Sequence, residues 1–113
     1  MSNDCLFCKI IRGEVPAEKL YEDDEVLAFR DIAPQAPVHF LVIPKHHIST
    51  LEDATPEHDS VLGKMFRIST EVAAQEGLQG FRATLNNGRV AGQVIFHSHL
   101  HIIGGRELGW PPG

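Results

Sequence analysis

The chain has 113 residues, enough for a single domain over 1–113, and its 42% hydrophobic and 22% charged content is typical of a globular protein rather than a disordered one. Its fifteen acidic and ten basic side chains give a formal net charge of -5, which excludes the basic surface that long nucleic acids require. The apolar runs are too short to span a membrane and the first residues lack the pattern of a secretory signal, so we expect a cytoplasmic location and no membrane partner.

Helical and strand patterns follow one another along the chain. In order, we predict a short helix at 5–12, strands at 19–22, 26–30 and 38–43, a long helix from about 56 to 77, and strands at 81–85 and 94–103. The long helix is predicted from apolar residues three and four apart, with Thr55 as its cap, Pro56 in its first position and Gly77 at its end. Most strands follow one another without helical crossovers, which favours an α+β fold with helices on one face of an antiparallel sheet.

Three histidines alternate along the last predicted strand. His97, His99 and His101 stand at i, i+2 and i+4, a spacing that places all three side chains on one face of a strand. Neutral imidazole is the commonest metal ligand, and with a pKa of about 6.5 it also serves as nucleophile, base or acid. The row therefore indicates either a metal site or nucleophilic and acid–base catalysis.

The polar loop before the histidines favours catalysis on a phosphate. Asn86-Asn87-Gly88 and Gly92-Gln93 combine glycines, which let backbone N–H groups approach a ligand closely, with neutral amide donors. Such donors suit a phosphate better than a metal ion. Asn-Asn-Gly alone is also typical of an ordinary turn, so the loop indicates a phosphate site only together with the histidines that follow it.

Two cysteines near the start of the chain, Cys5 and Cys8, form a Cys-x-x-Cys pair. In a chain without a secretory signal this spacing indicates half of a zinc site, a redox pair or two unrelated cysteines. A thioredoxin-like redox pair would accompany a βαβ pattern, which the sequence lacks. A zinc site needs two further ligands, and His46-His47 or the histidine row could supply them in a closed Cys2His2 site of the structural type.

Taken together, these residues resemble the histidine triad family in its nucleotide-binding branch. The family signature, His-φ-His-φ-His-φ-φ with φ apolar, stands here at residues 97–103, with Ser98 in one apolar position. Other segments that match the branch in order are 29–32, 34–45, 92–93, 104–106 and the ending 110–113. The resemblance implies a five-stranded antiparallel sheet with one long and one short helix, and a homodimer in which two sheets join into one continuous sheet.

The resemblance also implies an activity, the hydrolysis of purine nucleoside 5′-phosphoramidates of the adenosine 5′-monophosphoramidate type to the nucleoside monophosphate and an amine. Carried over onto this sequence, His99 is the nucleophile and forms a covalent nucleotidyl-histidine. His101 and His39 orient the site and handle protons and phosphate charge. No metal or other cofactor is required for this chemistry.

A binding site for a purine nucleotide, AMP or GMP, is implied by the same resemblance. Asp31 would accept hydrogen bonds from the ribose hydroxyls, and Trp110 in the proline-stiffened tail would lie near the active site of the neighbouring subunit. Val94 stands where the branch often has a serine that donates to the phosphate, so one hydrogen bond is expected to be missing. The other implied binding residues are Phe7, Phe29, Ile32 and Leu41 around the base, and Asn86, Gly92 and Gln93 at the ribose and phosphate.

The Cys-x-x-Cys version of the family implies one structural zinc ion per chain, held by Cys5, Cys8, His47 and His97. This assignment withdraws His97 from catalysis and leaves His99 and His101 as the catalytic pair.

Three other functions share these sequence features. The same histidine chemistry serves hydrolases and transferases that act on dinucleoside polyphosphates. A nucleotide-binding regulatory protein would show the same triad. A histidine-rich metal-binding protein would bind several ions per chain rather than one at most.

Overall fold

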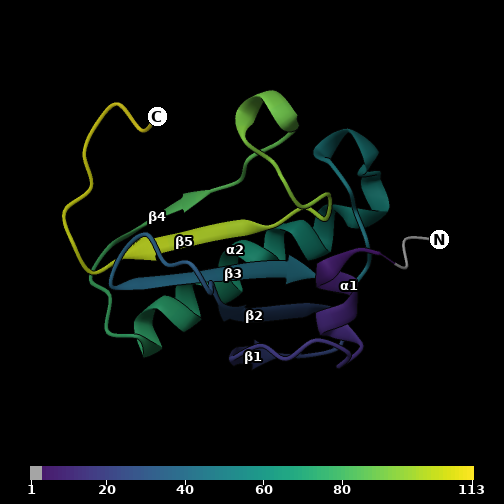
Figure 1. Ribbon diagram of the computed structural model, residues 1–113, viewed down its shortest axis with the longest axis horizontal. Helices are drawn as coiled ribbons and strands as arrows, with labels where there is room; N and C mark the ends of the chain where they lie inside the picture. The colour runs from purple at the N-terminus through teal and green to yellow at the C-terminus, as the bar shows by residue number, and fades with distance from the viewer. Residues whose placement is uncertain (1–3) are drawn as a thin grey trace.

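The computed structural model describes residues 4–113, which form a five-stranded antiparallel sheet in the order β1-β2-β3-β5-β4 with a helix on either side (Figure 1). The strands are β1 (Lys19–Glu22), β2 (Val26–Arg30), β3 (Val38–Pro44), β4 (Phe81–Thr84) and β5 (Leu100–Gly104), and the helices are α1 (Leu6–Ile11) and α2 (Asp59–Gln75). Short 3-10 turns lie at Leu51–Asp53, Pro56–His58 and Arg89–Ala91. The predicted α+β class, the five strands and the two helices are thereby confirmed.

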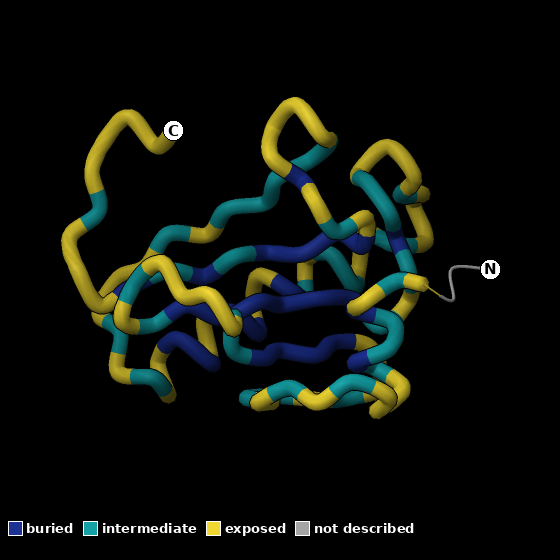
Figure 2. The backbone as a smooth tube through the Cα atoms, viewed as in Figure 1, coloured by how far each residue is buried: buried dark blue, intermediate teal, exposed yellow. Residues whose placement is uncertain are grey.

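The two helices cover opposite faces of the sheet, and the expectation that they share one face is wrong. Helix α2 lies behind the sheet in Figure 1 and packs on one set of alternate strand residues, while α1 lies in front and packs on the other set. The central strands β2 and β3 are apolar at nearly every position and buried along their length (Figure 2). Strands of that kind need cover on both faces, because neither face can be left to water.

Helix α1 covers only part of its face, since six residues reach about 9 Å. Its buried Phe7 and Ile10 pack against Phe29 and Leu41, which project from β2 and β3. The rest of this face stays open, and this is where the histidines lie.

Helix α2 begins and ends close to the predicted residues. Pro56–His58 forms a 3-10 turn after Thr55, and the α-helix continues from Asp59. Gly77, with a φ of 79°, donates its N–H to the carbonyl of Ala74 and ends the helix. Neither helix has the length and apolar character to cross a membrane, for the residues that the structure describes.

The last strand is shorter than predicted, because residues 94–99 do not join the sheet and β5 begins only at Leu100. In register, the last pair between β3 and β5 is Val42 with Leu100, and two residues further along β3 stands Pro44, which has no N–H for the ladder. The Ser98 N–H instead donates to the carbonyl of Ile48 at 2.6 Å. His97 and His99 therefore lie before β5 and do not belong to the strand.

Candidate active site

His99 is held in one defined tautomer immediately before β5. Its Nδ1 lies 2.7 Å from the carbonyl oxygen of His97, which can only accept, so Nδ1 carries the proton and Nε2 keeps its lone pair. The ring is buried, with 5% of the residue exposed, and meets the ring of Phe7 edge to face at 5.0 Å between centroids. Burial lowers the pKa of His99, which keeps the imidazole neutral and therefore nucleophilic near pH 7.

His39 and His101 form a directed pair beside it. The backbone N–H of Gln35 donates to His39 Nδ1 at 3.0 Å, so the proton of neutral His39 sits on Nε2. That N–H donates to His101 Nδ1 at 3.0 Å, which places the remaining proton of His101 on its Nε2. His101 is thus a hydrogen-bond donor next to the lone pair of His99, with 4.9 Å between the two ring centroids.

Asp31 follows the end of β2 and supplies the negative charge of the site. One of its carboxylate oxygens lies 3.4 Å from His39 Nε2 and 4.0 Å from His101 Nδ1. The other accepts the N–H of Ala33 at 2.7 Å, which fixes the carboxylate. Burial lowers the pKa of His101 to about 4 with help from the neighbouring imidazoles, and Asp31 only partly opposes this shift. Asp31, His39 and His101 also lie close enough together to serve as metal ligands.

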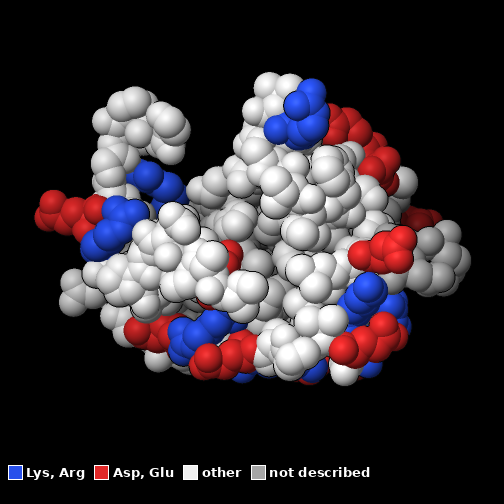
Figure 3. Space-filling model, in the orientation of Figure 1, with Lys and Arg blue, Asp and Glu red and all other residues white. Residues whose placement is uncertain are grey.

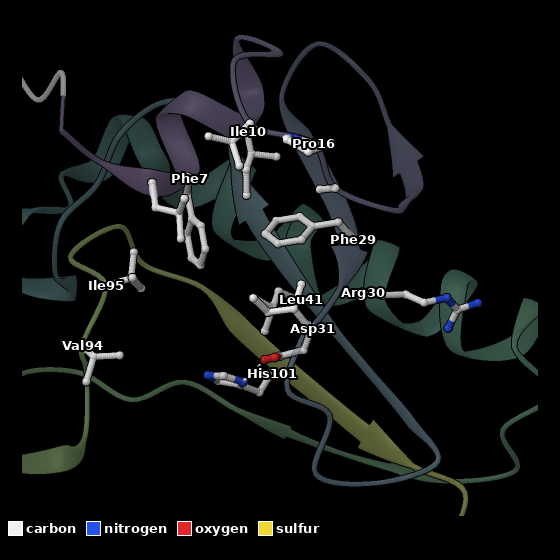
Figure 4. A pocket seen from close by; sticks show the side chains of 14 residues that line it. Phe7, Ile10, Pro16, Phe29, Arg30, Asp31, Leu41, Val94, Ile95 and His101 are labelled. Carbon is white, nitrogen blue, oxygen red and sulfur yellow. Dashed lines mark ion pairs between the residues drawn. The ribbon is translucent and has the colours of Figure 1, made fainter.

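An apolar pocket of about 250 Å³ opens between α1 and this cluster (Figure 4). Asp31 and His101 lie together at one end of it, and the rings of Phe7 and Phe29 stand at the other. The implied binding residues that line the pocket are Phe7, Phe29, Asp31, Ile32, Leu41, Val94 and His101. Residues that sequence reasoning missed are Leu6, Ile10, Val15, Pro16, Ala17, Arg30 and Ile95. Of these, Ile10 could have been found from its spacing of three from Phe7, one helical turn away.

The remaining implied binding residues lie outside this pocket. Asn86 lines a second depression on the other side of His101. The buried Gln93 uses its side chain to hold its own loop, because its amide donates to the carbonyl oxygens of Ser49 and Ile95 and accepts the N–H of Gly88. Gly92 forms the turn of that loop with a φ of 100°. Trp110 is exposed in the C-terminal tail, 82% of it accessible, and lines neither the apolar pocket nor the second depression.

Cys5, Cys8, His47 and His97 come together at the other end of the histidine row. Cys5 Sγ lies 3.4 Å from His97 Nδ1, and Cys8 Sγ lies 3.2 Å from His47 Nδ1 and 3.6 Å from His97 Nδ1. Zinc with bonds of about 2.3 Å to sulfur and about 2.0 Å to nitrogen separates tetrahedral ligands by roughly 3.5 Å, so the four donors fit this ion. Both cysteines are free of disulfides.

The residues around this cluster orient its side chains in a way that suits cation binding. The Nε2 atoms of His97 and His47 are engaged by the Pro44 carbonyl at 2.7 Å and the Ser49 hydroxyl at 2.9 Å, which turns both Nδ1 atoms toward the sulfurs. Burial lowers the pKa of His97 to about 4, so the imidazole is neutral as a ligand must be. Burial and the neighbouring Cys5 raise the pKa of Cys8 to about 11, and a bound cation is what would offset that effect.

Known proteins resemble this chain in fold and in sequence. The histidine triad (HIT) domain family matches residues 12–108. The purine nucleoside phosphoramidase of Escherichia coli strain K12 is 46% identical over 111 residues, 96% of this chain and 93% of that protein, and an uncharacterized HIT-like protein of Synechococcus elongatus is 55% identical over 114 residues, 100% of both. A HIT family hydrolase from Legionella pneumophila has a crystal structure that superposes with a TM-score of 0.94 at 47% identity, over 96% of this chain and 99% of that one. The chain therefore belongs to the HIT domain family and is a hydrolase.

Proposed function

We propose that this hydrolase cleaves purine nucleoside 5′-phosphoramidates, such as adenosine 5′-monophosphoramidate, to the nucleoside monophosphate and an amine. The observation that carries the proposal is the tautomer of His99, whose Nδ1–H is held by the carbonyl of His97 while Nε2 keeps its lone pair. The Escherichia coli relative is named for this activity, which supports the same reaction here.

The nucleotide fits the site with its base in the apolar pocket and its phosphorus at the histidines. Phe7, Phe29 and Leu41 offer the walls for a purine, and Asp31 beside His101 offers an acceptor for the ribose hydroxyls. Ile32 lines the same pocket with 97% of its surface exposed, so that a bound base could cover it.

The reaction then proceeds in two steps. His99 Nε2 attacks phosphorus and forms an N–P bond, while the P–N bond to the amine breaks and its electron pair stays on the amine nitrogen, which takes a proton from solvent. Water then attacks phosphorus, breaks the bond to His99 and returns a proton to solvent. In both steps the Nε2–H of His101, directed by His39, donates to a phosphoryl oxygen and stabilises its charge.

A steady-state assay with adenosine 5′-monophosphoramidate tests the proposal together with His99→Asn. We expect this variant to lose at least about four orders of magnitude in turnover, because the attacking nitrogen is gone. AMP binding should remain, because Asp31 and the apolar pocket are unchanged. His101→Ala should reduce turnover less than His99→Asn does, because it removes a helper and not the attacking atom.

Rapid quenching of the wild type with labelled substrate should trap nucleotide on His99, as located by peptide mapping. A label on another residue, or an Asn variant that hydrolyses near the wild-type rate, would falsify this mechanism. Faster cleavage of a dinucleoside polyphosphate than of the phosphoramidate would instead favour that substrate class. Binding without turnover of either would indicate a regulatory role.

We further propose that Cys5, Cys8, His47 and His97 hold one structural zinc ion per chain. The donor distances, the directed imidazoles and the two thiols support this choice. Four protein ligands would close the coordination sphere, so the ion would stabilise the fold and take no part in either chemical step.

We also propose a homodimer in which two sheets join. The edge strand β4 has β5 on one side only, and Phe81 on β4 and Phe66 on α2 are exposed large apolar side chains that a second subunit could cover. Light scattering at micromolar concentration should give the mass of a dimer, and a monomer mass would contradict it. Deleting residues 110–113 should change the preference among leaving amines more than it changes stability, if Trp110 reaches the partner's site. The cytoplasmic location stays a prediction.

A further inference from the structure

A second depression adjoins the catalytic histidines on the side away from the apolar pocket. It has a volume of about 340 Å³, and His39 and His101 line it. Arg82 and Arg106 also line it, and we call this depression the arginine groove. Among residues 4–113, no acidic side chain lines this groove.

The sheet places Arg82 on the face that carries the catalytic site. Thr84 of β4 pairs with His101 of β5, and Arg82 pairs with Ile103. Residues two apart on a strand project from the same face about 7 Å from each other, so Arg82 and His101 share that face of the sheet. Arg82 is half-buried, and its guanidinium donates to the carbonyl of Gly109 at 2.6 Å.

Arg106 approaches the groove from the other side. It follows β5 after Gly105, and its guanidinium donates to the carbonyl of Gln35 at 3.0 Å and to that of Glu107 at 3.1 Å. Gln35 is the residue whose N–H orients His39, so Arg106 is anchored to the loop that orients this histidine. The two arginines therefore face the reaction site from β4 and from the end of β5.

Both arginines keep N–H donors and charge available. Within residues 4–113 neither forms an ion pair with a carboxylate, whereas Arg12, Arg30 and Arg67 each do. Carbonyl oxygens engage only one donor of Arg82 and two of Arg106, out of the five that each guanidinium offers. Figure 3 shows basic side chains gathered at the base of the C-terminal tail, with acidic atoms beside them on the outer side, in a chain whose net charge is -5.

We propose that the arginine groove binds an anionic group carried by the leaving amine, so that the preferred substrates are phosphoramidates whose amine bears a carboxylate or a phosphate. This inference rests on the proposed function. With the base in the apolar pocket and phosphorus at the histidines, His101 stands where the pocket and the groove meet. Guanidinium groups recognise carboxylate and phosphate through paired charge-assisted hydrogen bonds. The bond changes at phosphorus are those of the proposed reaction.

The test compares adenosine 5′-phosphoramidates that differ only in the amine. β-Alanine carries a carboxylate, β-alaninamide is its neutral counterpart, and O-phosphoethanolamine and ethanolamine form the matching phosphate pair. For the wild type we expect kcat/KM to be about tenfold higher for each acid than for its neutral counterpart. The larger of the two ratios identifies whether carboxylate or phosphate is the natural group.

Removal of the arginine charges should abolish this preference. In the Arg82→Gln, Arg106→Gln double variant, kcat/KM should fall about tenfold for the acidic substrates and stay within about twofold for the neutral ones. Arg67→Gln on the exposed surface of α2 removes a charge elsewhere and should leave all ratios unchanged. Arg106→Lys keeps the charge at an exposed position and should keep part of the preference for acidic amines. This variant replaces the double variant in the test if the double variant does not fold.

The outcomes separate the inference from the proposed function. Turnover of the neutral substrates reports the phosphoramidase itself and does not depend on the groove. Equal kcat/KM for acidic and neutral amines in the wild type would overturn the inference while the proposed function stands. An equal loss in Arg67→Gln would also overturn it, because the effect would then come from net charge. Absence of turnover with every substrate would overturn both.

Discussion

Single hydrogen bonds fix the protonation of three histidines in this site. A backbone N–H at Gln35 can only donate and a carbonyl at His97 can only accept, so neither leaves a choice of tautomer to its imidazole partner. The result is a lone pair on His99 beside a donor N–H on His101, which is the arrangement that attack on a charged phosphoryl group requires. Main-chain atoms therefore fix the tautomers on which the proposed chemistry depends.

The low pKa of His101 makes stability depend on pH. Its pKa is about 4 in the folded protein and about 6.5 in an unfolded chain, so between these values the unfolded state binds one more proton. The stabilisation is therefore present above pH 6.5 and is lost as the pH falls toward 4. Asp31, His39 and His99 are the ionisable groups that face this ring.

We expect His101→Gln to remove this dependence. Urea unfolding at several values between pH 7 and pH 4.5 should show the wild type losing up to about 1.4 kcal/mol more than the variant for each pH unit. The difference in unfolding free energy between the two proteins removes the contribution of histidines distant from His101. A difference that does not change with pH would show that His101 titrates normally in the folded protein.

Val94 offers a second test at the scale of one side chain. It lines the apolar pocket with 82% of its surface exposed, so replacing it costs little stability. Val94→Ser should add one hydrogen bond to the phosphate and tighten AMP binding by about fivefold, corresponding to roughly 1 kcal/mol. Calorimetric titration measures this. Val90→Ser, in the same loop but outside the pocket, is the matched control and should leave AMP binding unchanged.

At the scale of elements, the sequence predicts where chains are helical or extended better than it predicts where they pair. The periodicity of apolar residues predicted the five strands and two helices. Apolar residues two apart mark the buried face of a strand, and apolar residues three and four apart mark the buried face of a helix. It did not reveal that the alternating histidines lie mostly before the strand. His97 and His99 alternate as strand residues do, but Pro44 ends the ladder opposite them, and that partner is distant in sequence.

The same limit applies to the helices and to the pocket. Apolar residues at nearly every position of β2 and β3 indicate burial on both faces, yet six residues of α1 carry little sign of which face they cover. The resemblance named half of the residues that line the apolar pocket, whereas Asn86, Gly92, Gln93 and Trp110 lie outside it. The Arg82 side chain had no such signal, because it reaches the site only through the pairing of β4 with β5.

The end of β5 depends on a glycine that no other residue can replace without strain. Gly105 has a φ of 93°, and a Cβ there would lie 2.9 Å from Cβ of Pro37. Gly105→Ala should destabilise the fold by about 2 kcal/mol or more, which is roughly 8 °C in Tm. Gly63→Ala, at an open and exposed position in α2, should raise Tm instead, because alanine favours helix. Calorimetry that finds both changes alike would contradict this assignment.

Over the whole molecule, the cysteine and histidine cluster links parts of the chain that are far apart in sequence. Cys5 and Cys8 belong to the start of α1, His47 follows β3, and His97 precedes β5. The carbonyl of His97 also accepts the Nδ1–H of His99, the proposed nucleophile, so the cluster and the candidate active site share one segment. Zinc at this position would fasten α1 over the face of the sheet on which the apolar pocket opens.

Loss of zinc is therefore expected to lower stability more than activity. Elemental analysis of protein purified without added metal should find about one zinc per chain. In Cys5→Ser, Cys8→Ser the zinc should be absent and the free energy of unfolding lower by at least about 3 kcal/mol, because binding of the ion is coupled to folding. Phosphoramidase activity should remain measurable, since the proposed nucleophile His99 and its helper His101 are not zinc ligands.

His46→Ala provides the control for that experiment, because it removes an exposed histidine next to His47 that is not part of the cluster. It should keep its zinc and its Tm. Chelation of the wild type should reproduce the Tm of the double cysteine variant, and zinc added back should restore only the wild type. If chelation abolished activity while circular dichroism and Tm stayed unchanged, the ion would be catalytic and its structural assignment wrong.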